Sequence, residues 1–289
     1  MRKVIITGVS GMLGKEVKDV FKSDYEIYGI DVKEIDDYSI EFIKLDITKK
    51  DEIYDLIPKI NPDYFIHLAA YTDVDRAEIE MEKCFLVNAI GTRNVSIACQ
   101  RFDTPLLYIS TDYVFDGKKG SPYLEYDNPN PINSYGMSKY WGEIFVRDLL
   151  QKFWIVRSSW LFGEGGKNFV DTILKLSKRQ PLLRIVDDQI GSPTYTKDLA
   201  FAIRKIIEEA GFGIYHITNS GYCSWYEFAN EVLKMKKKKL EVVPIKSDEL
   251  HREAKRPEDS RLENFMWKLS GFKPLRDWKE ALKEYLEGK

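Results

Sequence analysis

The sequence predicts an α/β protein: a doubly wound parallel Rossmann sheet joined to a second, smaller α/β lobe. Strand-like and helix-like segments alternate through the first half of the chain, and repeated βα units favour parallel sheets with right-handed crossovers. A glycine-rich turn, Gly8–Gly14, lies between the first strand and the first helix. A buried strand then delivers Ser-Thr-Asp-Tyr, residues 110–113, to its carboxyl end, where ligands sit in such sheets.

The elements of the first half follow from short apolar runs and from helical periodicity. The expected strands are Lys3–Thr7, Glu26–Ile30, Phe42–Leu45, Tyr64–Leu68, Pro105–Ile109 and Trp154–Arg157. The expected helices are Met12–Phe21, Lys49–Ile57 with Thr48 as its N-cap, Cys84–Gln100 and Ser134–Gln151. We assign residues 1–160 to a dinucleotide-binding domain on this basis.

After Arg157 the alternation of strands and helices loosens. The expected short strands are Leu183–Val186, Gly213–Ile217 and Leu240–Pro244. The expected helices are Asn168–Lys178, Asp198–Ala210, Trp225–Leu233 and Trp278–Leu286. We assign residues 161–289 to a substrate-binding lobe, with an interleaved boundary because some of these elements can return to the main sheet.

Composition narrows the class of protein. The 44 basic and 46 acidic residues nearly cancel, so no global field attracts nucleic acid, and no apolar run reaches membrane-spanning length. The three cysteines, Cys84, Cys99 and Cys223, show no C-x-x-C spacing, which argues against a disulfide framework or a zinc site. The chain enters a strand at once, without a signal peptide, so we expect a cytoplasmic protein. A charged fraction of 31%, rich in Lys and Glu, resembles thermophile composition.

The first turn predicts a dinucleotide site. Gly8, Gly11 and Gly14 let the backbone approach a pyrophosphate, and the helix N-terminus supplies free N–H groups and positive potential. Asp31, seventeen residues after Gly14, closes the second strand and is placed to bond ribose hydroxyls, which favours NAD over NADP. Lys33 acts in the opposite direction, so both NADH and NADPH stay open as cofactors. A surface turn remains the alternative role for Asp31. The other cofactor residues expected in these turns are Ser10, Met12 and Leu13 after the first strand and Asp46 and Ile47 after the third, the last two beside the adenine.

Tyr135 and Lys139 carry the predicted chemistry. They lie four residues apart and project from one face of a helix. An ammonium group beside a phenol lowers the phenol's pKa, so Tyr135 can exchange a proton with a substrate oxygen. Tyr285 and Lys289 match the same spacing by chance, so the spacing alone does not indicate catalysis. The prediction depends on the position of Tyr135 and Lys139 after the Ser110-Thr111 strand end.

Together these motifs resemble the dTDP-4-dehydrorhamnose reductases, a branch of the extended short-chain dehydrogenase/reductase superfamily. The resemblance implies reduction of dTDP-4-dehydro-L-rhamnose to dTDP-L-rhamnose by hydride transfer from NAD(P)H. It spans nearly the whole chain. The segments that carry it are Gly8–Gly14, His67–Glu78, Val87–Val95, Ser110–Gly117, Tyr135–Lys139, Arg157–Phe162, Asn168–Phe169, Asp188–Tyr195, Ser224–Ala229, Arg256–Pro257 and Ser260–Leu262.

The resemblance also implies roles for individual residues. Thr111 would bond the keto oxygen, Tyr135 would protonate it, and Lys139 would hold the nicotinamide ribose and tune Tyr135. Further cofactor contacts would come from Leu68, Ala69, Ala70, Tyr71 and Asn88. The implied substrate contacts are Asp112, Tyr113 and Trp160 at the sugar, Asn168 toward the nucleotide phosphates, and Arg256 and Arg261 at phosphate or sugar, the two arginines having surface ion pairs as their alternative.

Metal, assembly and alternative functions follow from the same resemblance. Some relatives use Mg²⁺ at a dimer interface through several glutamates. Glu16 occupies one such position, but Thr196-Lys197-Asp198 lacks the expected partner, so we expect no required metal. The resemblance also suggests a homodimer. The alternatives are a regulatory subunit of a methionine adenosyltransferase and a nucleotide-sugar 4-epimerase, which would hold NAD tightly. Intact Thr111, Tyr135 and Lys139 favour an enzyme, and the segment Asp188–Thr194 favours the reductase.

Overall fold

The main domain is a seven-stranded sheet whose strands all run parallel. The computed structural model describes residues 1–35 and 37–289. Its strand order is β11-β6-β5-β4-β1-β2-β3. The strands are β1 (Arg2–Thr7), β2 (Tyr25–Asp31), β3 (Glu41–Lys44), β4 (Tyr64–His67), β5 (Leu106–Thr111), β6 (Phe153–Ser158) and β11 (Gly213–His216). The strand order reverses at β1, so the crevice between the carboxyl ends of β1 and β4 is the expected ligand site.

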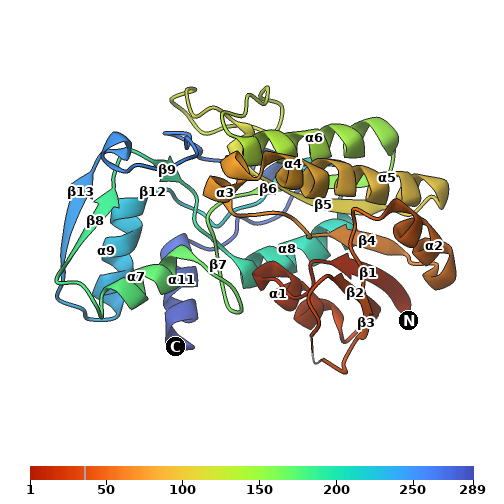
Figure 1. Cartoon of the computed structure of the whole chain (residues 1–289). Helices are drawn as coiled ribbons and strands as arrows, with labels where there is room; N and C mark the ends of the chain where they lie inside the picture. Colours follow the sequence, from red (N-terminus) through yellow and green to blue (C-terminus); the bar gives the residue numbers. More distant parts are fainter. Residues whose placement is uncertain (36) are drawn as a thin grey trace.

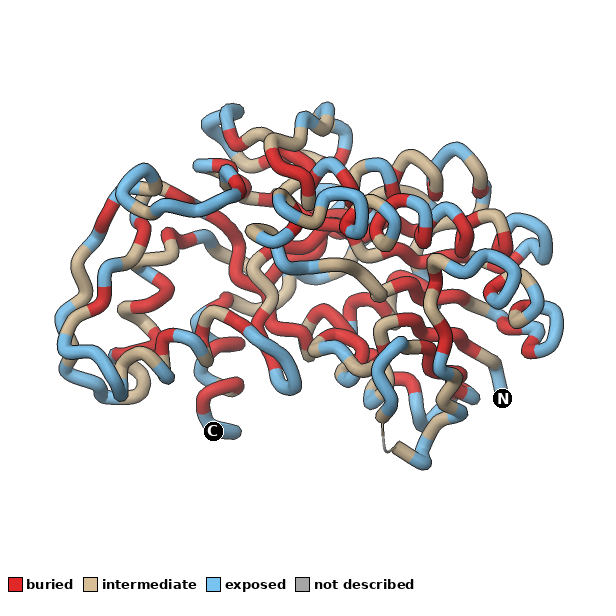
Figure 2. Tube along the Cα trace, viewed as in Figure 1, coloured by how far each residue is buried: buried red, intermediate tan, exposed pale blue. Residues whose placement is uncertain are grey.

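Helices cover both faces of this sheet (Figure 1). One face packs against α1 (Met12–Phe21) and α8 (Thr196–Glu209), with buried residues such as Val17 and Ile203 in the interface. The other face packs against α2 (Lys50–Ile60), α5 (Thr92–Arg101) and α6 (Ser134–Leu149), around Phe65 and Val95. The central strands β1, β4, β5 and β6 are mostly buried (Figure 2), as their near-continuous apolar sequences predict, whereas the edge strand β3 is partly exposed.

A smaller lobe is built from short strands, helices and an aromatic core. Its two-stranded sheets pair β8 (Leu182–Val186) with β13 (Glu241–Ile245), β9 (Ile190–Gly191) with β12 (Cys223–Ser224), and β7 (Leu161–Phe162) with β10 (Thr194–Tyr195). Its helices are α7 (Phe169–Leu176), α9 (Trp225–Met235) and α11 (Trp278–Glu287). Phe162, Phe228, Trp278 and Tyr285 pack together in its core.

The chain passes between the two lobes repeatedly after residue 160. The strand β11 pairs with β6 in the main sheet, and α8 packs against α1. The short helix α10 (Phe265–Leu269) also returns to the main domain, where Trp267 is buried in the same core as α1. The lobes are therefore interleaved in sequence, and a division at residue 160 separates α8 and β11 from the sheet they complete.

Two local expectations were wrong. The predicted helix Cys84–Gln100 is three pieces: α4 (Met81–Phe85), a π-helical stretch η1 (Leu86–Gly91) and α5. The widened turn of η1 carries Asn88, which bonds the backbone of Tyr71. Thr48 does not cap α2. The N-cap residue of α2 is Lys49, and the Thr48 N–H donates to the Asp46 carboxylate. Among the described helices, none combines the length and apolar character that a membrane crossing requires.

Candidate active site

A cavity of about 730 Å³ lies at the carboxyl ends of β1, β2, β4 and β5 and reaches the smaller lobe. It brings together most of the residues singled out from the sequence. The predicted cofactor residues that line it are Gly8, Ser10, Gly11, Met12, Leu13, Gly14, Asp31, Asp46, Ile47, Leu68, Ala69, Ala70, Tyr71, Tyr135 and Lys139. The predicted substrate residues that line it are Thr111, Asp112, Tyr113 and Trp160.

Two glycines of the turn, Gly8 and Gly14, lie where no side chain fits. A side-chain carbon on Gly8, whose φ is +71°, would lie 2.7 Å from the Ala69 nitrogen. One on Gly14 would lie 2.2 Å from the carbonyl oxygen of Gly8. The helix α1 begins at Met12 without a side-chain cap, so its first N–H groups are available to an anion. This bare cradle at a helix N-terminus fits the pyrophosphate of a dinucleotide.

Asp31 is held at the end of β2 by bonds to the glycine turn. Its carboxylate accepts hydrogen bonds from the Ser10 amide at 3.1 Å and the Ser10 hydroxyl at 2.8 Å. The other carboxylate oxygen accepts from the Lys33 amide at 3.1 Å. Asp31 therefore fixes the glycine turn and places its own carboxylate at the cavity wall.

A buried polar network supports the opposite wall. The Thr7 hydroxyl lies 2.7 Å from His67 Nδ1 and accepts from the Leu68 and Ala69 amides. Burial lowers the pKa of His67 to about 3, so the ring is neutral. Asn88 does not line the cavity. Its side chain bonds both the amide and the carbonyl of Tyr71, so it orders the wall from behind.

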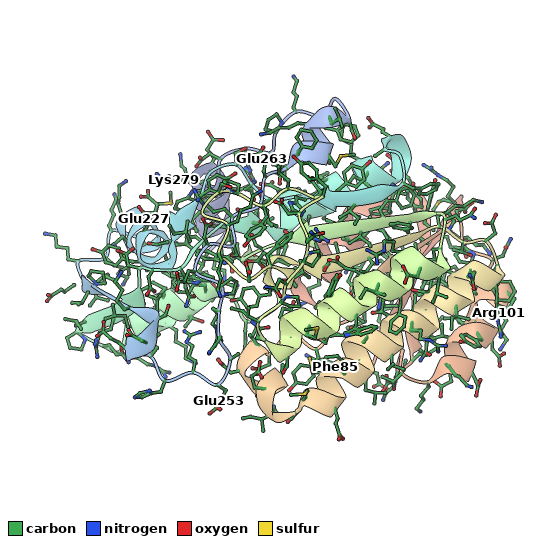
Figure 3. The ribbon with its side chains drawn as sticks, turned by 90° about the horizontal axis from the view of Figure 1, so that it is seen from above. Phe85, Arg101, Glu227, Glu253, Glu263 and Lys279 are labelled. Carbon is green, nitrogen blue, oxygen red and sulfur yellow. The ribbon has the colours of Figure 1, made fainter. Side chains whose placement is uncertain are left out.

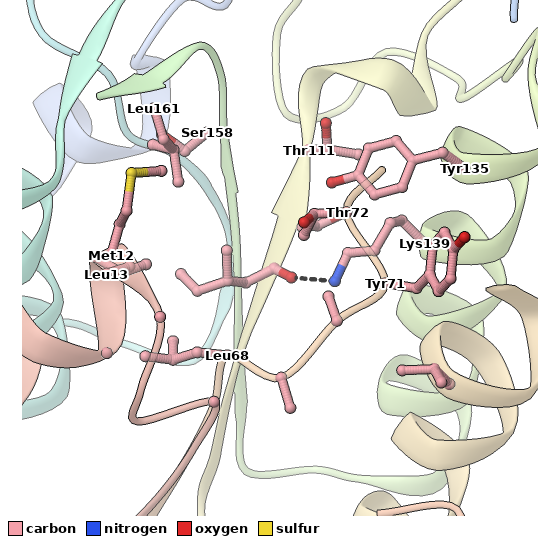
Figure 4. Close-up of a pocket in the computed structure, with 18 of the residues that line it drawn as sticks. Met12, Leu13, Leu68, Tyr71, Thr72, Thr111, Tyr135, Lys139, Ser158 and Leu161 are labelled. Carbon is pink, nitrogen blue, oxygen red and sulfur yellow. Dashed lines mark hydrogen bonds between the residues drawn. The ribbon is translucent and has the colours of Figure 1, made fainter. Parts of the chain in front are cut away.

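Thr111, Tyr135 and Lys139 meet at the end of β5 (Figure 4). Thr111 is the last residue of β5, and Tyr135 and Lys139 lie on the first turns of α6, which begins after an Asn133 cap. Figure 4 shows the Thr111 and Tyr135 hydroxyls side by side, with the Lys139 ammonium below them. A keto oxygen placed against the two hydroxyls would find two hydrogen-bond donors there.

The pKa of Tyr135 differs from the sequence-based expectation. Burial raises it above its ordinary value, and the Thr111 hydroxyl offsets only part of that rise. The Lys139 ammonium donates to the Ile109 carbonyl at 2.6 Å and lies 4.1 Å from the centre of the Tyr108 ring. Burial lowers the pKa of Lys139 itself to about 7, while Glu143 acts to raise it. Tyr135 therefore keeps its proton through the neutral range.

Asp112 is a buried carboxyl next to this group. One oxygen accepts from the Thr111 hydroxyl at 3.0 Å, and the other is buried with no hydrogen-bond partner among residues 1–35 and 37–289. Burial raises the pKa of Asp112 to about 7. A carboxyl in this state can donate as well as accept a hydrogen bond near neutral pH.

The raised pKa of Asp112 makes a prediction about stability. The folded protein binds one proton more than the unfolded chain between the ordinary pKa of 3.8 and about 7, so this contribution to stability falls as pH rises. Asp112→Asn mimics the protonated form. We expect it to match wild type near pH 4 and to exceed it in unfolding free energy above pH 7 by up to about 4 kcal/mol. Urea unfolding across this interval measures the difference. A difference that does not change with pH would contradict the raised pKa.

Three predicted substrate residues lie outside the cavity lining. Asn168 caps α7, accepting from the Asp171 amide at 2.9 Å and donating to the Gly163 carbonyl at 2.9 Å. Arg256 is paired with Asp75 and Arg261 with Asp259, the ion-pair alternative considered for both arginines. Direct contacts of these three side chains with substrate therefore stay predictions without support from their positions.

Other residues occupy the substrate end of the cavity. Trp160, held at a positive φ of 48°, stacks on Trp225 with ring centroids 3.5 Å apart and an interplanar angle of 7°. Trp225 and Lys167 both line the cavity, and neither was expected there from the sequence. Lys167 immediately precedes Asn168, which does not line the cavity. In the sequence, the only indication of Lys167 as a cavity residue was its position next to Asn168.

Glu16 lies away from this cavity. It is half-buried, which raises its pKa, while Lys197 acts to lower it. No group of three His, Cys, Asp or Glu side chains suited to a metal ion is found in the part of the chain that the structure describes. The expectation that no metal is required stays a prediction.

The sequence matches the model of the RmlD substrate binding domain family over residues 1–289. The chain belongs to the RmlD family. The spore coat polysaccharide biosynthesis protein SpsK of Bacillus subtilis is 38% identical to this chain, and the alignment covers 99% of this chain and 98% of that protein. A dTDP-4-dehydrorhamnose reductase of Aggregatibacter actinomycetemcomitans is also 38% identical, covering 98% of both chains.

A solved structure of a relative superimposes closely on this one. The dTDP-4-dehydrorhamnose reductase of Bacillus anthracis, solved in complex with NADP, superimposes with a TM-score of 0.93 at 42% identity and covers 100% of both chains. The RmlD resemblance therefore extends over the full sheet and the smaller lobe. It agrees with the fold class and family predicted from the sequence.

Proposed function

We propose that the chain is an NAD(P)H-dependent dTDP-4-dehydrorhamnose reductase, which reduces dTDP-4-dehydro-L-rhamnose to dTDP-L-rhamnose. The observation that carries the proposal is the meeting of Thr111, Tyr135 and Lys139 inside a cavity whose other end is a dinucleotide cradle. The relatives named as reductases, one of them bound to NADP, support the substrate and the cofactor.

In this proposal each residue has a defined task. The reduced nicotinamide supplies the hydride. The Tyr135 phenol, protonated at neutral pH, donates its proton to the keto oxygen that becomes the hydroxyl. The Thr111 hydroxyl turns from Asp112 to the same oxygen and stabilises the charge that develops on it. Lys139 holds the nicotinamide ribose, and Trp160 with Trp225 closes the sugar end of the cavity.

The test is the loss of nicotinamide absorbance when purified protein meets dTDP-4-dehydro-L-rhamnose, run in parallel with NADH and NADPH. Rapid oxidation of either cofactor supports the reductase. Cofactor binding without oxidation would contradict it and favour the regulatory-subunit alternative. NAD that stays bound through purification, together with interconversion of 4-hydroxyl epimers, would favour the epimerase.

Asp31 is expected to set the cofactor preference. Its carboxylate lines the ribose end of the cavity and would repel a 2′-phosphate, whereas Lys33 would attract one. We expect Asp31→Ala to raise the ratio of kcat/KM with NADPH to that with NADH by about tenfold, the effect of roughly one lost charge interaction. Steady-state kinetics with both cofactors measure the ratio. An unchanged ratio would show that Asp31 does not discriminate between them.

Assembly, location and source complete the proposal. Exposed apolar side chains on α4, η1 and α6 support a homodimer, since such patches mark interfaces; they are Met81, Leu86, Ile90, Met137 and Trp141. A single sedimenting species of monomer mass would contradict it.

The three buried thiols support a reducing, cytoplasmic location, which cell fractionation tests. The Lys- and Glu-rich composition supports a thermophilic source, and an ordinary mesophilic melting temperature would contradict that.

A further inference from the structure

The short helix α3 (Val74–Ile79) lies between three parts of the molecule that must cooperate. Residues 68–72 before it, and Val74 itself, line the cofactor end of the cavity. Its other neighbours are the start of α6 and a segment of residues 254–258 that returns from the smaller lobe, here called the return segment. Two carboxylates of α3, Asp75 and Glu78, have no task in the chemistry described above.

Asp75 holds the return segment. Its carboxylate accepts from Arg256 Nη1 at 2.6 Å and from Nη2 at 2.7 Å, a two-pronged pair in which only 8% of the Arg256 side chain is exposed. The Ala254 amide donates to the same carboxylate at 3.3 Å. Arg256 Nη1 also donates to the Ala254 carbonyl at 2.7 Å, so the segment is folded around the guanidinium group. Bidentate pairs of this kind fix orientation as well as distance.

The return segment also contacts the loop before α6 and the loop after β5, the two elements that carry Tyr135, Lys139 and Thr111. Asn133, the cap of α6, donates to the Lys255 carbonyl at 2.8 Å. Pro257 lies so close to Gly117 that a side-chain carbon on that glycine would be 2.6 Å away. Figure 3 shows Glu253, the residue before this segment, on the side of the molecule where the helix with Phe85 lies.

Glu78 holds the other partner, the catalytic helix. One carboxylate oxygen accepts from the Ser134 amide at 2.7 Å, and the other accepts from the Ser134 hydroxyl at 2.8 Å. Ser134 is the first residue of α6 and directly precedes Tyr135. The first N–H groups of a helix lack partners inside the helix, and negative charge is favoured there. Glu78 therefore fixes the turn from which the phenol projects.

We propose that Asp75 and Glu78 are positioning residues: α3 joins the return segment of the smaller lobe to the start of the catalytic helix, so the substrate is presented to Tyr135 in one register. The proposal rests on the reductase function proposed above. It makes Arg256 a positioning residue that acts through Asp75, in place of the direct substrate contact expected from the sequence. Asp75 fixes the return segment of the smaller lobe, and Glu78 fixes the start of the helix that carries the Tyr135 phenol.

The Asp75 half of the proposal is tested by a double-mutant cycle. Asp75→Ala, Arg256→Ala and the double variant are each expected to raise KM for the nucleotide sugar about tenfold, with kcat changed less than about twofold. The double variant should be no worse than either single variant, because both singles break the same pair. Arg76→Ala is the matched control, since Arg76 lies on the same helix, is exposed and pairs with Glu80 instead of the return segment. Effects that multiply, or a normal KM in Asp75→Ala beside a raised one in Arg256→Ala, would overturn this role.

The Glu78 half is tested by the opposite kinetic signature. Glu78→Gln keeps the side-chain shape and is expected to lower kcat about tenfold while leaving KM and cofactor affinity unchanged. A variant that raises KM and leaves kcat intact would overturn this role.

Amide hydrogen exchange gives a readout that needs no turnover. We expect faster exchange at the Ser134 amide and its neighbours in Glu78→Gln, and at residues 254–258 in Asp75→Ala, with the amides of β1 unchanged in both. Unchanged exchange at both places would overturn the proposal. A wild-type chain that reduces no keto sugar would contradict the reductase function alone, and the exchange measurement would still decide the part played by α3.

Discussion

Tyr135→Phe is expected to lower kcat for keto-sugar reduction by about a hundred- to ten-thousand-fold while the cofactor binds as in wild type. The variant loses only the phenolic oxygen, which lies beside the Thr111 hydroxyl at the cavity wall. Burial holds the proton on this phenol, so in wild type it is available at neutral pH to complete the alcohol. Stopped-flow or steady-state oxidation of the cofactor measures kcat, and fluorescence titration measures cofactor affinity.

Tyr140→Phe provides the matched control for this variant. Tyr140 lies on the same helix, five residues further on, and packs beside the cluster of Val114 and Phe115. The same atom is removed from the same element, so we expect activity close to wild type. Equal loss in both variants would assign the effect to the helix, and full activity in Tyr135→Phe would remove the phenol from the mechanism.

The largest loss of stability is expected from Arg157→Met. Arg157 and Glu143 form an ion pair with both side chains nearly fully buried: Nη2 lies 2.7 Å from Oε2 and Nε lies 2.9 Å from Oε1. The Ser110 hydroxyl donates to the same carboxylate at 2.5 Å. Removing the guanidinium leaves a buried charge without its counter-ion, which costs about 3–5 kcal/mol of unfolding free energy. Denaturant unfolding measures it.

Two comparisons isolate the cause of that loss. Arg157→Met combined with Glu143→Leu removes both charges, so the double variant should be more stable than Arg157→Met alone. Lys205→Ala breaks the exposed pair with Glu209 and should cost only about 0.5 kcal/mol or less. A double variant less stable than the single one would show that packing, and not the uncompensated charge, dominates.

The parts of the fold and site that could be predicted from the sequence are those encoded locally. The glycine turn, the Tyr-x-x-x-Lys spacing and the apolar strands each depend on neighbours within a few residues, and the structure places their residues on one cavity. The π-helical turn at Asn88 was not predictable in this way, because it depends on the contact between Asn88 and the backbone of Tyr71.

The remaining differences are set by partners distant in sequence. Asn168 bonds Tyr285, which lies 117 residues away, and Arg256 bonds Asp75, which lies 181 residues away. Spacing alone could not distinguish these structural bonds from contacts with a ligand. The pKa of Tyr135 was misjudged for a similar reason, because desolvation by the assembled core outweighs the charge of a lysine one turn away.

The interleaved path of the chain limits how this protein can be divided or recombined. The sheet is completed by β11 and backed by α8, both of which come after β7 and α7 of the smaller lobe. A fragment ending at residue 160 would expose the apolar surface that Leu199 and Ile203 normally cover. Exchange of the smaller lobe between relatives, to alter the sugar that is accepted, therefore requires several splice points that leave α8, β11 and α10 with their own sheet.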